Sequence, residues 1–206
     1  MDRPLRVGIA LYNNEYYHVA HDAWEEPWLS LPEGEDERFL HGLIQYTAAI
    51  YHARNRNWIG ATGLAQSAHE YLDDLFSLYR GVDLDPVRET LLALETDPEW
   101  IERTRPPRLS YQNTVPLPSD LDTEECLLAA PLIASAGEYE TAVVERACTY
   151  AREALDSRES DPFLALCVEF VRDSEHRAVV SQRLSDRVSR RRAREREVEG
   201  LFDPGN

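Results

Sequence analysis

The chain has 206 residues, with 38 acidic and 22 basic side chains and a formal net charge of −16. All of the basic residues are arginine, and so acidic a chain is not expected to bind nucleic acid, because phosphate contacts need a basic face. Salt screens the self-repulsion of such a surface, so the lysine-free acidic composition predicts a halophilic protein.

The cysteines and the apolar runs indicate a protein of a reducing cytoplasm. Cys126, Cys148 and Cys167 lie far apart and form neither a metal-ligand spacing nor a disulfide framework. The longest nearly apolar run, residues 127–136, is too short to cross a bilayer, and the N-terminus lacks a secretory apolar region. We therefore expect a cytoplasmic location and no membrane partner.

Glycine and proline separate long stretches that have helical spacing. The first predicted helix covers residues 5–26 and should kink or stop at Pro27, which cannot donate a backbone hydrogen bond. An acidic loop leads into the second, residues 36–54, which is apolar on most faces and is therefore expected to be central.

Capping residues predict where the next two helices begin. Asn57 is expected to cap a helix over residues 58–79, because its side chain can accept from a free backbone N–H of the first turn. Asp85 is a predicted N-cap, and Pro86 suits the first position of a short helix that ends near residue 94.

Residues 97–120 form the one long irregular segment, with five prolines, and are interpreted as a crossing linker or as a loop laid over a groove. Helical spacing then returns over residues 123–135, 138–156 and 162–196. The end of the last stretch is rich in both arginine and glutamate, which is typical of a solvated helix end, with a partner-binding arm as the alternative.

No strand alternation is present, so the predicted fold is an all-α bundle of antiparallel helical hairpins. The sequence of residues 14–20 is weakly similar to that of residues 137–143, and the sequence of residues 38–46 to that of residues 162–170. These similarities indicate two degenerate hairpin repeats. The expected organisation is a helical bundle over 1–96, a connecting segment over 97–120, and a C-terminal helical extension over 121–206 that packs on the first part.

Polar side chains at helical spacing form stripes on the first two predicted helices. His18, His21 and Glu25 share one face of the first helix, and His41, Gln45 and His52 share one face of the second. A short connection makes neighbouring helices antiparallel, so the stripes are expected to meet inside the bundle.

Three interpretations of these stripes remain open. The first is a structural network, in which Glu25 accepts a hydrogen bond from His21 or His52 and Tyr16, Tyr17 and Tyr46 complete the pairing. The second is a pocket for a small ligand or a protein segment. The third is a metal or acid–base site, with catalytic candidates His21 and Glu25.

The predicted ligand pocket has polar and aromatic parts. Its residues are His21, Glu25, Gln45 and His52, with walls from Trp24, Trp28, Tyr46 and Trp58. No metal ion is predicted, and the candidate ligands for one are His18, His21, Glu25 and His52. A third class of function is an interaction scaffold, with residues 97–118 or 186–199 as docking arms. The sequence names no cofactor and leaves open whether the protein is an enzyme.

The first part of the chain resembles domain of unknown function 309, a family of small helical proteins of bacteria and archaea. The resemblance covers about residues 8–80, and residues 97–206 look like a C-terminal extension in a haloarchaeal member. The departures are Asn14, Asp22 and Pro27. The resemblance implies a compact all-α bundle and places recurring polar residues on the stripes, but implies no activity. The matching residues are His21, Glu25, Trp28, Gly42, Leu43, Ile44, Gln45, His52, Asn57, Gly60 and Ala61.

Overall fold

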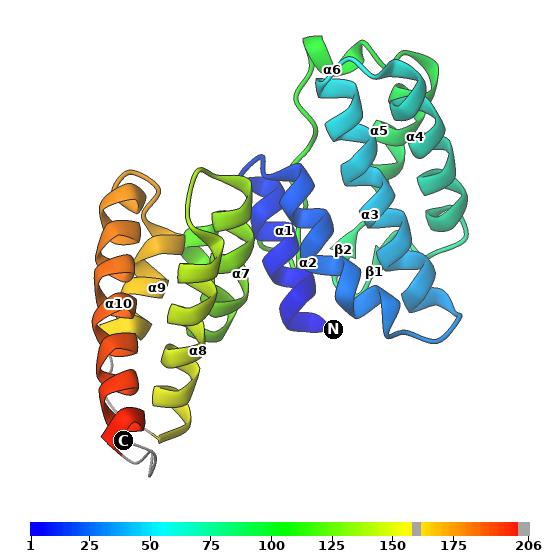
Figure 1. The fold of residues 1–206 in the computed structure, drawn as a ribbon. Helices are drawn as coiled ribbons and strands as arrows, with labels where there is room; N and C mark the ends of the chain where they lie inside the picture. The colour runs from blue at the N-terminus through cyan, green and yellow to red at the C-terminus, as the bar shows by residue number, and fades with distance from the viewer. Residues whose placement is uncertain (158–161, 202–206) are drawn as a thin grey trace. The chain divides into compact units, whose positions relative to one another are not determined.

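The structure, a computed structural model, describes residues 1–157 and 162–201, without the side chains of residues 198–201 (Figure 1). The secondary structure is almost entirely helical, which confirms the all-α class. The chain divides into two compact units, residues 1–121 and residues 122–206. Within the described residues, no helix combines the length and the apolar character that a membrane span requires.

The first unit, coloured blue to green in Figure 1, is a helical bundle with one small hairpin. Its elements are α1 (Asp2–Asn13), α2 (Tyr17–Leu29), α3 (Glu35–Arg54), α4 (Trp58–Leu72), β1 (Leu78–Tyr79), β2 (Val82–Asp83), α5 (Asp85–Thr96), α6 (Trp100–Arg103) and the 3-10 helix η1 (Pro118–Asp120).

The single first helix expected over residues 5–26 is wrong, because α1 and α2 are separate helices. Glu15 has a left-handed φ of 66°. The N–H of Tyr16 bonds to the carbonyl of Leu11 and that of Glu15 to the carbonyl of Tyr12. This is the Schellman pattern, in which backbone groups close a helix end, here without the usual glycine. Pro27 lies in the last turn of α2 rather than ending it.

The third predicted helix is correct at its start and too long at its end. The Oδ1 atom of Asn57 accepts from the N–H of Gly60 at 3.1 Å, which confirms the cap. The helix stops at Leu72, and the antiparallel strands β1 and β2 follow where no strand was expected. Asp85 is also not a cap, because Leu84 takes that position and Asp85 is the first helical residue.

The core of the first unit lies around α3, which contacts α2, α4, α5 and α6. Trp24 of α2 is fully buried, and its Nε1 atom donates to the carbonyl oxygen of Leu5 at 3.3 Å. Gly8 of α1 makes this contact possible, since a Cβ atom there would lie 2.1 Å from Nε1 of Trp24. The close approach of α1 to the indole therefore depends on glycine.

The proline-rich segment is part of the first unit, and the end of α1 is one of the elements that hold it. The side-chain amide of Asn13 donates to the carbonyl oxygens of Leu109 and Pro116, both at 2.9 Å, and its oxygen accepts from the N–H of Leu109 at 2.7 Å. The Tyr12 hydroxyl donates to the carbonyl of Pro107 at 2.9 Å. These contacts attach the segment to α1, and the interpretations as a crossing linker and as a loop laid over a groove both stay predictions.

The second unit packs four helices, α7 (Thr123–Ala136), α8 (Thr141–Ser157), α9 (Pro162–Arg172) and α10 (Arg177–Leu201). The last predicted helix, over 162–196, is therefore wrong, because it is two helices. Asp173 accepts from the N–H groups of Glu175 and His176, which starts a new turn. The buried guanidinium of Arg177 donates to the carbonyls of Phe170 and Val171 and so satisfies the end of α9.

The cysteines are three free, buried thiols of the second unit. Cys148 of α8 and Cys167 of α9 approach to 3.7 Å between their sulfur atoms. The hydrogen bond with Cys167 lowers the pKa of the Cys148 thiol, and burial opposes that shift. The pair fills the core between two helices, as expected for small apolar residues.

Candidate functional site

All of the predicted site residues except Trp58 lie on α2 and α3, which pack against each other in opposite directions, and Trp58 is the first residue of α4. The imidazole of His18, near the start of α2, stacks on the ring of Tyr51, near the end of α3, at a centroid distance of 5.2 Å. Trp28, near the end of α2, lies 4.5 Å from the ring of His41, near the start of α3. The polar residues therefore form two clusters, one toward each end of the helix pair.

The first cluster contains His18, His21 and Asp22, which occupy one turn of α2. Each can offer one ligand atom, and the three atoms lie within 4.8 Å of one another. The Nδ1 atom of His21 is 2.8 Å from Oδ1 of Asp22, and the two side chains are 26% and 34% exposed. His18 is exposed to solvent. This cluster therefore combines two imidazoles and a carboxylate at a place that solvent reaches.

The second cluster is centred on His41, whose ring lies 4.5 Å from the ring of Trp28 and 4.1 Å from that of Tyr71. The Trp28 indole N–H donates to a carboxylate oxygen of Glu37 at 2.7 Å, and the same oxygen is 3.6 Å from Nδ1 of His41. The other ring nitrogen, Nε2, is 2.9 Å from the amide nitrogen of Gln45. Aromatic packing and hydrogen bonds thus fix the position of this imidazole.

One atom of the second cluster lacks a partner. The Oε1 atom of Gln45 is buried and accepts no hydrogen bond within the described part of the chain. Exchanging the amide oxygen and nitrogen would give His41 an acceptor and leave the nitrogen unpaired instead, so one end of the amide is unsatisfied in either orientation. A buried polar atom without a partner costs about 1–3 kcal/mol.

The structure does not bring Glu25 and His52 to either histidine cluster. Glu25 is exposed and makes no hydrogen bond or ion pair among the residues that the structure describes. The Nδ1 atom of His52 is 2.7 Å from the side-chain nitrogen of Asn57, beyond the end of α3. His21 pairs with its neighbour Asp22. The structural network centred on Glu25 is therefore absent from the described residues.

The aromatic residues expected to wall a pocket have different environments. Trp24 and Tyr46 are fully buried and belong to the core, whereas Trp28 and Trp58 are half-buried. The hydroxyl of Tyr46 is 2.7 Å from that of Tyr12, and burial is the main cause that raises the pKa of both phenols. A pocket enclosed by all four rings stays a prediction, and Trp28 is the one of the four whose ring contact with a histidine cluster is found among the described residues.

Sequence reasoning missed three side chains of these clusters: Asp22, Glu37 and Tyr71. Asp22 follows His18 by four residues and Glu37 precedes His41 by four, so the i,i+4 rule could have found both. Tyr71 lies on α4, thirty residues after His41, and its contact depends on how α3 and α4 pack. Nothing in the sequence signals that contact.

A comparison with protein families finds one match in the half of the chain that carries both clusters. Residues 5–64 match the family described as domain of unknown function, DUF309. This segment belongs to DUF309. The match confirms the resemblance drawn from the motifs, within somewhat narrower limits than residues 8–80. The DUF309 segment contains all of the predicted site residues but ends inside α4, before Tyr71. No curated protein matches the chain.

Proposed function

We propose that the first unit binds a divalent transition-metal ion through His18, His21 and Asp22. The observation that carries the proposal is the presence of three donor atoms within 4.8 Å on one turn of α2. Imidazole nitrogen and carboxylate oxygen are ligands that zinc and similar ions take at about 2.0–2.2 Å. Small side-chain rotations would bring all three to that distance from one ion.

The position of the three donors on one helix favours binding. Residues at i, i+3 and i+4 of a helix face the same way, so no loop has to be ordered when the ion arrives. The ring of Tyr51 packs on His18 from α3 and limits its movement. The net charge of −16 also raises the local concentration of cations around the protein.

Three protein ligands leave at least one coordination position of the ion open. Sites with two histidines, one carboxylate and open positions are used to hold a substrate or an activated water. Because His18 is exposed and His21 is partly so, a small molecule could reach that position. The proposed function is therefore metal-dependent binding of a small ligand. If the protein is an enzyme, the same site would use the metal ion as a Lewis acid, for example in hydrolysis.

The test is a titration of tag-free protein with Zn²⁺ and Co²⁺, followed by calorimetry and by the visible absorption of bound Co²⁺. We expect one ion per chain. We expect His21→Ala and His18→Ala to weaken binding at least about tenfold. Even the loss of a residue that only hydrogen-bonds to a metal ligand weakens metal binding by that factor.

The matched control for this titration is His176→Ala. His176 is exposed and also pairs with a carboxylate, that of Asp173, at 2.8 Å, but no second histidine belongs to the pair. The control should bind the ion like the wild type. Equal loss of affinity in the control and in His21→Ala, or no stoichiometric ion in the wild type, would contradict the proposal.

A second candidate function, binding of a small polar ligand beside His41, is supported by the unsatisfied amide of Gln45. If a ligand normally pairs with this amide, Gln45→Leu should lose the ligand and raise the thermal stability of the free protein, because an apolar side chain needs no partner. Native mass spectrometry and thermal unfolding measure the two effects, with the exposed Gln66→Leu as control. The proposal is contradicted if Gln45→Leu is less stable than the wild type and the wild type binds no ligand. The Gln45 amide would then serve only the stability of the fold.

A further inference from the structure

The last helix concentrates positive charge in an acidic protein. Residues 177–197 of α10 carry eight arginines and three carboxylates, although acidic residues outnumber arginines in the whole chain. The helix packs on α8 and α9 through Val180, Leu184 and Val188, which are buried. Its arginines therefore surround a single apolar stripe, and their individual environments differ.

Some of these arginines are already paired within the second unit. Arg191 binds Glu153 of α8 at 2.8 Å and Glu195 of its own helix at 3.1 Å, and it lies 3.8 Å from the ring of Tyr150. Its charge is thus neutralised by carboxylates and its guanidinium is held in place. Such an arginine has a structural role and offers little to a ligand.

Three others have no carboxylate partner among the described residues. The guanidinium groups of Arg183, Arg187 and Arg190 make no hydrogen bond or ion pair to any residue that the structure describes. They lie at i, i+4 and i+7, so they share one side of α10. Together with Leu166 of α9 and Asp186, they line a hollow of about 310 Å³.

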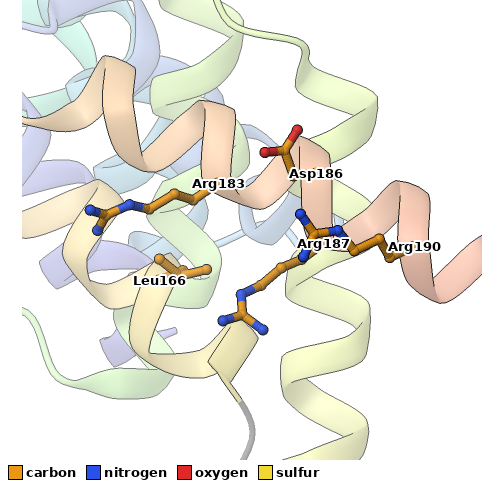
Figure 2. Close-up of a pocket in the computed structure, with 5 residues that line it drawn as sticks. All are labelled: Leu166, Arg183, Asp186, Arg187 and Arg190. Carbon is orange, nitrogen blue, oxygen red and sulfur yellow. The ribbon is translucent and has the colours of Figure 1, made fainter.

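Figure 2 shows how the side chains of this hollow are placed. Arg183 and Arg187 extend past Leu166 on opposite sides, and Arg190 follows along the same helix. The carboxylate of Asp186 points away from Leu166, and its Oδ1 atom accepts from Gln182 at 3.2 Å. In the described part of the chain, three cations therefore line the hollow, against one carboxylate that already has a partner.

We propose that this hollow binds the phosphate group of a small phosphate monoester. Among the described residues that line it, three guanidinium charges and one carboxylate leave two positive charges, which match the charge of about −1.5 to −2 of a phosphate monoester near pH 7. Guanidinium groups recognise phosphate through paired N–H donors. The apolar side chain of Leu166 would contact the organic part of the ligand.

The size of the site favours a small molecule over a nucleic acid. From Arg183 to Arg190 the helix rises only about 10 Å. A nucleic-acid site needs a longer basic surface, and the overall charge of −16 opposes a polyanion. A hollow of about 310 Å³ is at the lower end of the usual range for small-ligand pockets.

A second hollow, in the first unit, shows why free guanidinium groups matter. Residues 31–36, Tyr79 and Arg80 line a space of about 320 Å³. There the guanidinium of Arg80 binds both carboxylate oxygens of Asp36, which also accepts from the Tyr79 hydroxyl at 2.8 Å. Arg80, whose guanidinium is the only one among the described residues that line this hollow, is therefore neutralised, so the hollow offers no free cation to an anion.

The experiment is calorimetric titration of the full chain with phenyl phosphate and, separately, with inorganic phosphate at constant chloride concentration. We expect saturable binding of one phosphate group per chain, tighter for phenyl phosphate because its ring can contact Leu166. Arg187→Gln should weaken binding about tenfold or more, as expected for the loss of a charge-assisted hydrogen bond. Asp186→Asn should strengthen binding, because it removes the only negative charge among the described residues that line the hollow.

The matched control is Arg192→Gln. This arginine is exposed on the same helix and carries the same charge, but it lies on the opposite side from Arg183, since nine residues turn a helix by about 900°. The control should bind phenyl phosphate like the wild type, and circular dichroism should show both variants folded.

Three results would overturn the proposal. One is equal weakening by Arg187→Gln and Arg192→Gln, which would indicate a diffuse charge effect. The second is an Asp186→Asn variant that binds no better than the wild type. The third is binding of a uridine homopolymer with no saturable binding of phenyl phosphate, which would indicate a nucleic-acid surface instead.

Discussion

Trp24→Ala should destabilise the first unit by about 3–5 kcal/mol, which is the usual cost of deleting a buried tryptophan side chain. The indole is fully buried between α1 and the rest of the bundle, and Gly8 packs directly against it. Because Gly8 has no side chain to move inward, little of the cavity can be refilled. Urea unfolding followed by circular dichroism measures the loss.

Trp58→Ala is the control for this prediction. Trp58 is also a tryptophan of the DUF309 segment but is only half-buried, at the start of α4. Its replacement should cost clearly less, because part of its surface already contacts water. Equal losses for the two variants would mean that Trp24 is not the main apolar contact of α1 and α2.

Asn13→Ala should cost about 3 kcal/mol or more, although it removes a small side chain. Three hydrogen bonds join this amide to the backbone of the proline-rich segment, and the asparagine is buried. The substitution leaves the carbonyls of Leu109 and Pro116 and the N–H of Leu109 without a partner, at about 1–3 kcal/mol for each group that water cannot reach. Urea unfolding measures this effect as well.

Limited digestion with trypsin gives a second measurement for Asn13→Ala. The bond between Arg108 and Leu109 adjoins the anchored residue, so the variant should be cut there faster than the wild type. Asn55→Ala is the control, because the exposed Asn55 makes one local bond, to the carbonyl of Tyr51. An Asn13→Ala variant as stable and as resistant as this control would show that other contacts hold the segment.

Local sequence signals predicted most helices but not every boundary. The start of α4 followed from Asn57, whose amide does cap it. The boundary between α1 and α2 was missed because the left-handed residue is Glu15, where the usual signal is glycine. The break before α10 depends on Asp173, which accepts hydrogen bonds from the backbone of the next turn. In the sequence alone, Asp173 looks like any acidic residue on the surface of a helix.

The site could be predicted only as far as contacts are local. His18 and His21 were named from their spacing, and the structure places them together with Asp22. Glu25 and His52 were named by the same rule, but the structure gives each another environment. The contact of His41 with Tyr71, like that of Asn13 with Leu109, joins residues far apart in the sequence and depends on packing that no spacing rule contains.

The anchoring of the proline-rich segment by α1 has a consequence during protein synthesis. Asn13 meets its partners only after 96 and 103 further residues have been added. At about 5–20 residues per second, the ribosome needs about 5–20 s to supply them. A nascent chain that ends with the DUF309 segment at residue 64 therefore still has this amide unpaired and lacks Leu72 and Leu84 of the core. The first unit can complete its fold only after residue 121 has left the ribosome.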